Sequence, residues 1–211
     1  MYSTSRQEDA MNPDQPNSKR ESGDDRRVAI ALAARQIIVE KGLEGLRTRD
    51  IAARVGINIA TLHYHVPSKE ALVALVAESI RHDFRAQSMR HPREGKSALE
   101  QIHLEFDDFR ETVRDMPELI IILTELGERA RRDSAVAAIV TPLHQFWRNQ
   151  FVEIYRLGIA DGSFRPDLDP EGAALITTGA MSDCWRQSTV SRVDRLELVL
   201  AELERAFFRK S

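Results

Sequence analysis

Histidine and aspartate side chains are the first candidates for chemistry in this sequence, and their spacing argues against catalysis. His63 and His65 are two residues apart, so on a helix they point to different sides and cannot bind one metal together. The neighbouring Asp107 and Asp108 are expected to lie on a solvated face. The sequence holds no HExxH, no pair of ExxH segments, no glycine-rich phosphate loop and no GxSxG elbow. We therefore expect no enzyme, no cofactor and no metal site.

The cysteine content and the hydropathy of the chain indicate the cellular compartment in which the protein is expected to work. Cys184 is the only cysteine, so it cannot form an internal disulfide and is expected to be a small core residue rather than a reactive sensor. The N-terminus lacks a basic start followed by an apolar run, and apolar stretches such as 119–123 are too short to span a bilayer. We expect a cytoplasmic protein with no membrane partner.

Charge is distributed unevenly along the chain, although the formal net charge is only −3. Residues 26–91 hold 11 basic and 6 acidic side chains, whereas residues 92–211 hold 16 and 21. This asymmetry is expected when one small module meets phosphates and another does not. An excess of this size is also typical of a solvated basic face, so charge alone does not show that residues 26–91 bind nucleic acid.

The first part of the chain predicts an arm followed by four helices. Residues 1–25 are polar, with 3 basic and 6 acidic side chains, and are expected to be a flexible arm because they cannot offset the entropy of ordering. Apolar spacing predicts helices over 26–41, 48–55, 58–65 and 68–91. Thr48, Asn58 and Ser68 are the expected N-caps.

The second part predicts only helices, which makes the fold all-α. No alternating strand pattern bounded by turn residues occurs after Pro92. A kink is expected at Pro142. The predicted helices are 96–115, 118–132, 134–161, 170–189 and 192–209.

The two short helices and the turn at Gly56 predict a helix-turn-helix, whose second helix suits the major groove of DNA. Ile51, Val55, Ile57 and Leu62 can form the small core between these helices. Short helical hairpins occur in many unrelated folds, so the pattern alone only suggests this motif.

The residue types in this segment are more specific than the pattern of helices and turns. The run at 46–72, LRTRDIAARVGINIATLHYHVPSKEAL, resembles the head of the tetracycline-repressor (TetR) family almost position by position. That family typically shows Thr opening the second helix, Ala and Gly at the turn, Thr-Leu-Tyr in the recognition helix, and then His-Phe or His-Val and Ser-Lys-Glu. The resemblance covers about 26–75. It implies a DNA-binding transcriptional regulator, most simply a repressor released from its operator by a small molecule.

The resemblance also implies which residues meet double-stranded DNA. Thr48 and Lys69 would contact phosphates, as a hydroxyl and a positive charge at helix N-termini can, and Tyr64 with His65 would meet the duplex backbone. The family usually has Tyr where this chain has His63, so the resemblance does not imply which contact His63 makes. The implied DNA-binding residues are Thr48, Arg49, Asn58, Ile59, Ala60, Thr61, His63, Tyr64, His65 and Lys69.

Some head residues have two interpretations. Ile59 and Ala60 are apolar where exposure is expected, which suits contact with thymine methyl groups; alternatively they pack on a neighbouring helix. Arg47 and Arg54 either touch phosphate or are simply solvated.

The resemblance and the helix count together predict a two-domain architecture. The expected units are the arm at 1–25, a three-helix DNA-binding domain at 26–72 that continues into a linker helix to 91, and a ligand-binding and dimerisation domain at 92–211. Two subunits would form a homodimer on a near-palindromic operator. The expected dimer-interface residues are Ala173, Ile176, Ala180, Leu196, Leu200, Leu203 and Phe207. The alternative is that these stripes form an ordinary core within one chain.

A sensor cavity for an unknown small-molecule effector is expected among the C-terminal helices, lined by large adaptable side chains. The expected lining residues are Phe106, Phe109, Leu123, Trp147, Phe151, Met181 and Trp185. Each of these also suits a plain core. A rival class for the whole protein is an adaptor whose helix-turn-helix has lost its contact with DNA.

Overall fold

The computed structural model describes residues 23–186 and 192–209, and within these ranges the regular structure is helical apart from one isolated bridge between Phe164 and Phe208. The elements are α1 (Gly23–Lys41), η1 (Leu43–Gly45), α2 (Thr48–Val55), α3 (Ile59–His65), α4 (Lys69–Arg90), α5 (Ala98–Asp115), α6 (Pro117–Ala130), α7 (Ser134–Asp161), α8 (Pro170–Arg186) and α9 (Arg192–Phe207). The predicted all-α fold is confirmed. The arm expected at 1–25 lies almost wholly outside the described residues.

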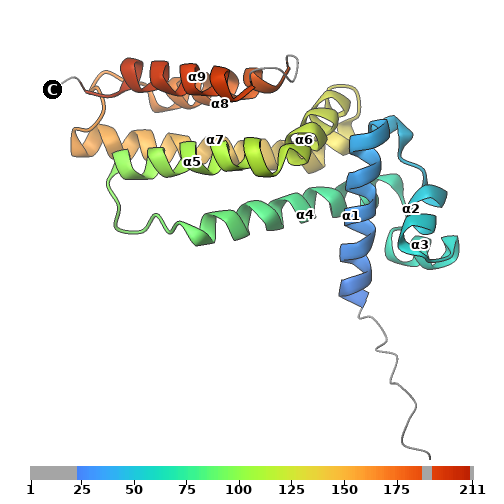
Figure 1. The fold of residues 1–211 in the computed structure, drawn as a ribbon. Coiled ribbons are helices and arrows are strands. Elements are labelled where there is room, and N and C mark those ends of the chain that lie inside the picture. Colours follow the sequence, from blue (N-terminus) through green and yellow to red (C-terminus); the bar gives the residue numbers. More distant parts are fainter. Residues whose placement is uncertain (1–22, 187–191, 210–211) are drawn as a thin grey trace, which may run out of the picture.

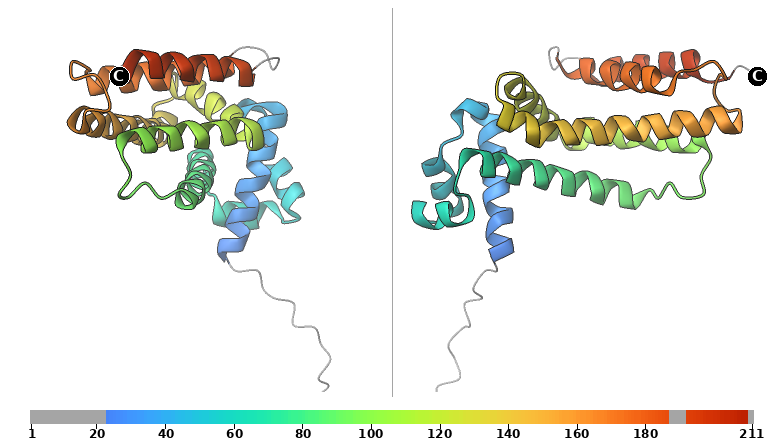
Figure 2. Two further views of the ribbon diagram at one scale, coloured as in Figure 1. Left: turned by 60° about the vertical axis from the view of Figure 1, so that its left-hand side comes forward. Right: turned by 180° about the vertical axis from the view of Figure 1, so that it is seen from behind.

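The helices stack in layers beside a small head (Figures 1 and 2). α4 forms one layer, α5 and α7 lie next to it, and α8 and α9 cover the far side of α5 and α7. α1 crosses the start of α4, and α2 and α3 lie on the outer side of α1. One end of α4 therefore belongs to the head and the other reaches along the layered part.

Local capping explains where the short helices begin. Asn58 Oδ1 accepts the Thr61 N–H at 2.7 Å, and Ser68 Oγ accepts the Ala71 N–H at 3.1 Å, as the sequence predicts. The N-cap expected at Thr48 is wrong by one residue: the Arg47 carbonyl already accepts the Asp50 and Ile51 N–H groups, so Thr48 is the first helical residue. Gly56 ends α2 at φ 73°, which glycine adopts without a steric penalty.

The C-terminal helices begin and end within a few residues of the predicted positions. α7 continues through Pro142 as one helix. Among the described residues, no helix is long and apolar enough to cross a membrane.

Two hydrophobic clusters hold the layers together. The first joins the head to α6 and the start of α7, because Leu119, Ile122 and Leu126 pack with Ile38 and Leu43. The second lies among α5, the rest of α7, α8 and α9. Cys184 is buried in the second cluster, as the sequence predicts. The head is therefore packed against the C-terminal helices and is not held by α4 alone.

We expect Gly158→Ala to lower the free energy of unfolding by about 1–3 kcal/mol because the site is already full. A Cβ at Gly158 would lie 2.1 Å from a ring carbon of Phe164. That ring cannot move aside easily, since it is buried between the rings of Tyr155 and Phe208 at centroid distances of 5.5 and 5.2 Å. Urea denaturation of the full chain measures the loss.

Gly127→Ala in α6 is the matched control. Its nearest neighbour would be His144 at 3.7 Å, an ordinary contact, so the helix should gain about 0.5–1 kcal/mol from alanine. Equal effects of the two substitutions would contradict the packing described here.

Candidate nucleic-acid interface

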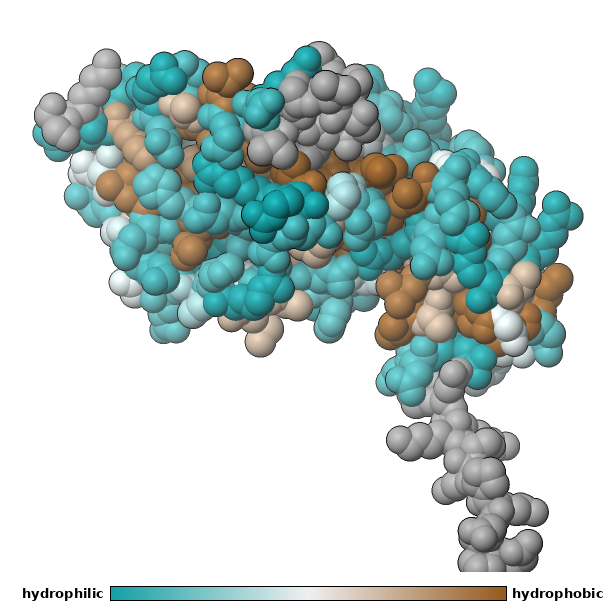
Figure 3. All heavy atoms as spheres, viewed as in Figure 1, coloured by the Kyte–Doolittle hydropathy of each residue, from teal (hydrophilic) through white to brown (hydrophobic). Residues whose placement is uncertain are grey.

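α3 turns an unusual set of side chains to solvent. Leu62 anchors the helix in the head core, followed by the buried Val66. On the outer side, Ile59 is 49% exposed and Tyr64 is 85% exposed, with Ala60 exposed beside them. Ile59 is therefore not part of the head core. Figure 3 shows hydrophobic surface on the head, whereas hydrophilic side chains cover most of the layered helices on that face.

Both ends of α3 are held in place. The Asn58 cap fixes its start, and Arg27 of α1 donates from Nη1 to the carbonyl oxygen of His65 at 3.0 Å, which fixes its end. Arg27 was not predicted as a site residue. Its partner is 38 residues away, and nothing in the sequence spacing connects the two.

Two helix N-termini lie at either side of α3 in the sequence. Thr48 is the first residue of α2 and Lys69 the first of α4, and both are exposed. Arg49 follows Thr48 with a side chain that is 81% exposed. The free N–H groups of a helix start and a nearby positive charge together suit a phosphate. Of the ten predicted DNA-binding residues, eight are exposed and Thr61 and His65 are half-buried.

Arg54 forms an ion pair with a carboxylate of its own chain. It donates to both carboxylate oxygens of Glu40 at 3.0 and 2.8 Å, and this hydrogen bond holds the pKa of Glu40 below its ordinary value. Lys41 acts in the same way on Asp50, with an N–O distance of 3.2 Å and a lowered Asp50 pKa. These pairs join α1 to α2, so Arg54 has a structural role that the sequence did not reveal.

The predicted dimer interface requires correction. Ala173, Leu196, Leu200, Leu203 and Phe207 are all at most 5% exposed and belong to the second cluster of a single chain. The prediction assumed that α8 and α9 could satisfy their apolar stripes only in part within one subunit. In the structure α7 and α5 cover those stripes. Ile176 remains 57% exposed, and Ala180 is half-buried.

A different set of apolar side chains on α8 and α9 faces solvent. Leu175 is 53% exposed and Leu198 is 67% exposed. We call the exposed apolar side chains of these two helices, Leu175, Ile176 and Leu198, the α8–α9 apolar face. Such large exposed aliphatic groups on two packed helices are a feature of protein interfaces.

The predicted pocket residues do not form one group. Phe106, Phe109, Phe151 and Met181 are buried in the second cluster, and Trp147 packs against it. Trp147 stacks on Phe109 at 5.7 Å between ring centroids and meets Phe151 edge-on at 5.8 Å. Leu123 packs instead with the head cluster, because α6 faces the head. The side chain of Trp185 lies outside what the structure describes.

The expectation of a solvated face at 107–108 is half correct. Asp107 is exposed, but Asp108 is buried and forms an ion pair with Arg93 at 2.7 Å. The residue that draws Asp108 inward lies in the loop between α4 and α5, which helical periodicity could not place.

Comparisons with known proteins agree with this geometry. A family model described as bacterial regulatory proteins, tetR family, matches residues 30–76. The HTH-type transcriptional repressor KstR2 of Mycolicibacterium smegmatis is 29% identical over 157 residues, 74% of this chain and 73% of that protein. The class D tetracycline repressor protein of Escherichia coli is 38% identical over 61 residues, 28% of each chain. A TetR-family regulator from Agrobacterium tumefaciens has the same fold, with a TM-score of 0.75 at 19% identity over 87% of this chain and 98% of that one.

Fold and surface together define a class: a helix-turn-helix head packed on a larger all-helical domain, the architecture of DNA-binding regulators. Residues 30–76 form a head of the tetR-family type, and the chain as a whole has the fold of TetR-family regulators.

We expect Asn58→Ala to lower the free energy of unfolding by about 1 kcal/mol, since it removes the only side-chain cap of α3 among the described residues. Chemical denaturation measures this effect. Asn58→Asp keeps a cap oxygen and should retain most of the stability. If alanine and aspartate behave alike, the cap contributes nothing.

Proposed function

We propose that this protein is a homodimeric repressor that binds a near-palindromic operator and is released by a small-molecule effector. The observation that carries the proposal is the outer face of α3, where Ile59, Ala60 and Tyr64 are exposed on a helix anchored from behind by Leu62. A helix of this kind, held rigidly and free on one side, suits the major groove. The proposed DNA-binding unit is 26–72, continued by α4, with 92–211 as the effector and dimer unit.

The residues divide by the kind of contact they would make. Thr48 and Lys69, at two helix starts, would bind phosphates and set the position of the head. Base edges would be met from α3 and from the start of α2, where side chains can reach into the groove. The base-reading residues proposed are Arg49, Ile59, Ala60, Thr61 and His63.

A dimer is proposed because one head offers few phosphate contacts. The α8–α9 apolar face is the surface proposed for it. Two such faces from two copies would form a four-helix bundle, in which each chain presents the same patch. The heads would then meet half-sites about one helical turn or somewhat more apart.

The effector is proposed to act by changing the spacing of the two heads. A ligand that fits the dimer better when the heads are wrongly spaced lowers operator affinity by its differential affinity for the two states, and by no more. The region proposed for it lies around Phe109, Trp147 and Phe151. Because these rings pack on one another, a ligand would have to displace Trp147, which is only partly buried.

An electrophoretic mobility-shift assay tests the proposal directly. The full chain is titrated against fragments from upstream of its own and neighbouring genes, with unrelated DNA of equal length as competitor. The proposal requires one fragment to be retained at competitor excess. Equal binding to every fragment would show DNA binding without sequence specificity and contradict the proposal. No binding at all would favour an adaptor that has lost its DNA contact.

We expect Lys69→Ala to weaken binding to all DNA sequences about equally and to lower the salt slope by about 1, since a phosphate contact carries no sequence information. Thr61→Val should instead change the preference at a single base pair by about 1–3 kcal/mol. Binding titrations at several salt concentrations on single-base operator variants separate the two effects. Lys96→Ala, in the distant loop before α5, is the matched control and should leave both quantities unchanged. A changed base preference in Lys69→Ala would assign that residue to base reading.

We expect Ile176→Glu with Leu198→Glu to yield folded monomers that no longer bind the operator, because two charges are placed in the proposed interface. Light scattering measures the mass. Met89→Glu on α4, where the side chain is 82% exposed on the opposite layer, is the control and should stay dimeric. Leu200→Glu should unfold the chain instead, since Leu200 is 1% exposed in the core. An intact dimer in the double variant would refute this interface.

A further inference from the structure

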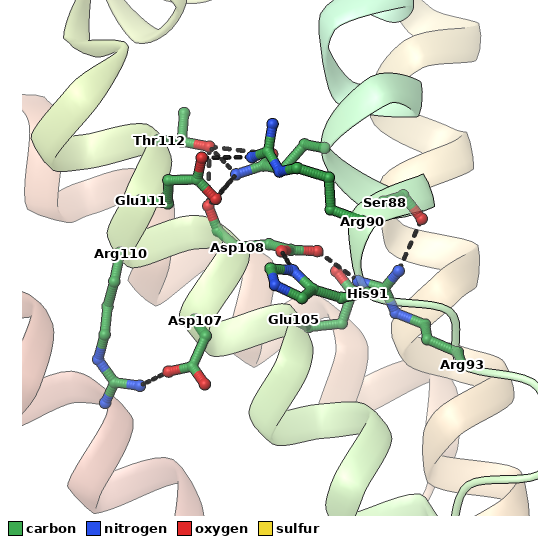
Figure 4. A network of polar contacts seen from close by, with 11 residues as sticks. Ser88, Arg90, His91, Arg93, Glu105, Asp107, Asp108, Arg110, Glu111 and Thr112 are labelled. Atoms are coloured by element: carbon green, nitrogen blue, oxygen red, sulfur yellow. Dashed lines mark hydrogen bonds and ion pairs between the residues drawn. The ribbon is translucent and has the colours of Figure 1, made fainter.

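A buried network of polar and charged side chains joins the far end of α4 to α5 (Figure 4). Arg93, in the loop between the two helices, donates from Nη2 to Asp108 Oδ2 at 2.7 Å and from Nη1 to Ser88 Oγ at 2.7 Å. Its Nη2 also forms an ion pair with Glu105 Oε1 at 2.9 Å. His91 Nδ1 lies 3.0 Å from the other oxygen of Asp108. We call these residues, with Gln87 and Thr112, the junction network.

The neutral members fix the two helices to each other. Gln87 of α4 is 4% exposed and donates from Nε2 to the backbone oxygen of Asp108 at 2.7 Å. Thr112 donates to the same oxygen at 2.9 Å. At the rim, Arg90 of α4 pairs with Glu111 of α5. The last turn of α4 is therefore held on α5 by side chains from both helices.

The charges in the network do not balance when both carboxyl groups are ionised. One guanidinium, that of Arg93, serves both Glu105 and Asp108. The Arg93 side chain is 15% exposed, and those of Glu105 and Asp108 are 9% and 11% exposed, so water screens them little. The network is neutral when one carboxyl carries a proton, or when His91 is protonated.

Among the described residues, Arg93 is the one cation that acts on Glu105. On its own helix the nearby charge is Asp108, and the loop gives Arg93. His91, the residue that caps the end of α4, contacts Asp108. The side chains that α7 contributes to the core around Phe106 include the rings of Phe151 and Tyr155. The Tyr155 hydroxyl bonds to Thr177 Oγ1 at 2.6 Å, and burial raises its pKa. Burial, opposed by Arg93 and assisted by the charge of Asp108, raises the pKa of Glu105 to about 7.

We propose that the junction network is a proton-dependent latch: with Glu105 neutral it holds the end of α4 firmly on α5, and when Glu105 loses its proton the excess negative charge loosens that end. α4 begins at Lys69 in the proposed DNA-binding face. Loosening its far end therefore frees the heads from one spacing and lowers operator affinity. The structural part of this inference is independent of DNA, whereas its effect on the operator rests on the proposed function.

Thermal unfolding of the full chain tests the latch. In the folded protein the pKa of Glu105 is about 7, so its carboxyl group keeps a proton up to a pH near 7. In the unfolded chain the pKa of Glu105 returns to its ordinary value of 4.5. Its contribution to stability is therefore fully present below 4.5 and is lost as the pH rises through about 7. The Tm of the wild type should fall between pH 5 and pH 8 relative to that of Glu105→Gln, which cannot ionise.

Two further variants make the test specific. Asp108→Asn leaves Arg93 to Glu105 alone, so the decline in Tm should move to lower pH. Glu197→Gln removes an exposed carboxylate that pairs with Arg110 on another face of α5, and it should keep the wild-type profile. Hydrogen exchange of residues 84–97, corrected for intrinsic rates, should speed up several-fold from pH 6 to pH 8 in the wild type and not in Glu105→Gln. Parallel profiles of wild type and Glu105→Gln in either measurement would overturn the latch.

Operator titrations at pH 6 and pH 8 test the link to DNA. Both proteins carry His63 and His65 on the DNA-binding face and His91 in the junction network, so Glu105→Gln reports the pH dependence that does not come from Glu105. We expect wild-type affinity to fall several-fold more than that of Glu105→Gln. An equal fall in both would show that the latch does not reach the heads. If no fragment binds at either pH, the proposed function fails. The hydrogen-exchange and Tm measurements then still test whether the junction network is a latch.

Discussion

Leu119, Ile122 and Leu126 of α6 are buried against side chains of α1, η1 and α4, and Val136 and Val140 of α7 complete the same cluster. The head cannot bury its own apolar surface without them, because a unit of roughly 50 residues has little core of its own. A shared core of close-packed side chains shifts as a whole rather than yielding at one point. The position of the DNA-binding face is therefore fixed by helices that belong to the other half of the chain.

Polar contacts reinforce this packing at places where the backbone needs a partner. The Glu125 carboxylate of α6 accepts the Leu43 N–H at 3.0 Å, directly after Gly42 at φ 69°. A hydrogen bond to a charged group contributes about 1.5–3 kcal/mol, more than an ordinary one. Arg129 pairs with Glu44 at 2.8 Å beside it. These contacts join α6 to the turn that follows α1, so movement of α6 has a direct route to the head that does not pass through α4.

α4 itself is held mainly by apolar packing near the head and mainly by polar and charged contacts at its other end. Near the head, Leu72, Val76 and Ile80 are buried among apolar side chains, and Arg35 of α1 pairs with Asp83 at 2.7 Å. At the other end the contacts are the buried charges around Arg93. Apolar packing is insensitive to pH, whereas buried ion pairs depend on protonation and on small changes of geometry. The end of α4 that is far from DNA is therefore the more adjustable of the two.

The sequence by itself determined the helices, their caps at Asn58 and Ser68 and the exposed outer side of α3, because these depend on neighbours within about one turn of helix. The family resemblance of 46–72 supplied the class of protein. What the sequence could not determine was which stripe meets which partner. Leu200 and Leu203 looked like a surface for a second subunit, and the fold buries them because α5 and α7 cover α9 and α8. Asp108 looked solvated until the loop brought Arg93 to it, and Leu123 joined the head because α6 turns toward it. Periodicity shows that a face is apolar or charged, but only the tertiary arrangement decides what covers it, since those contacts join residues far apart in the chain.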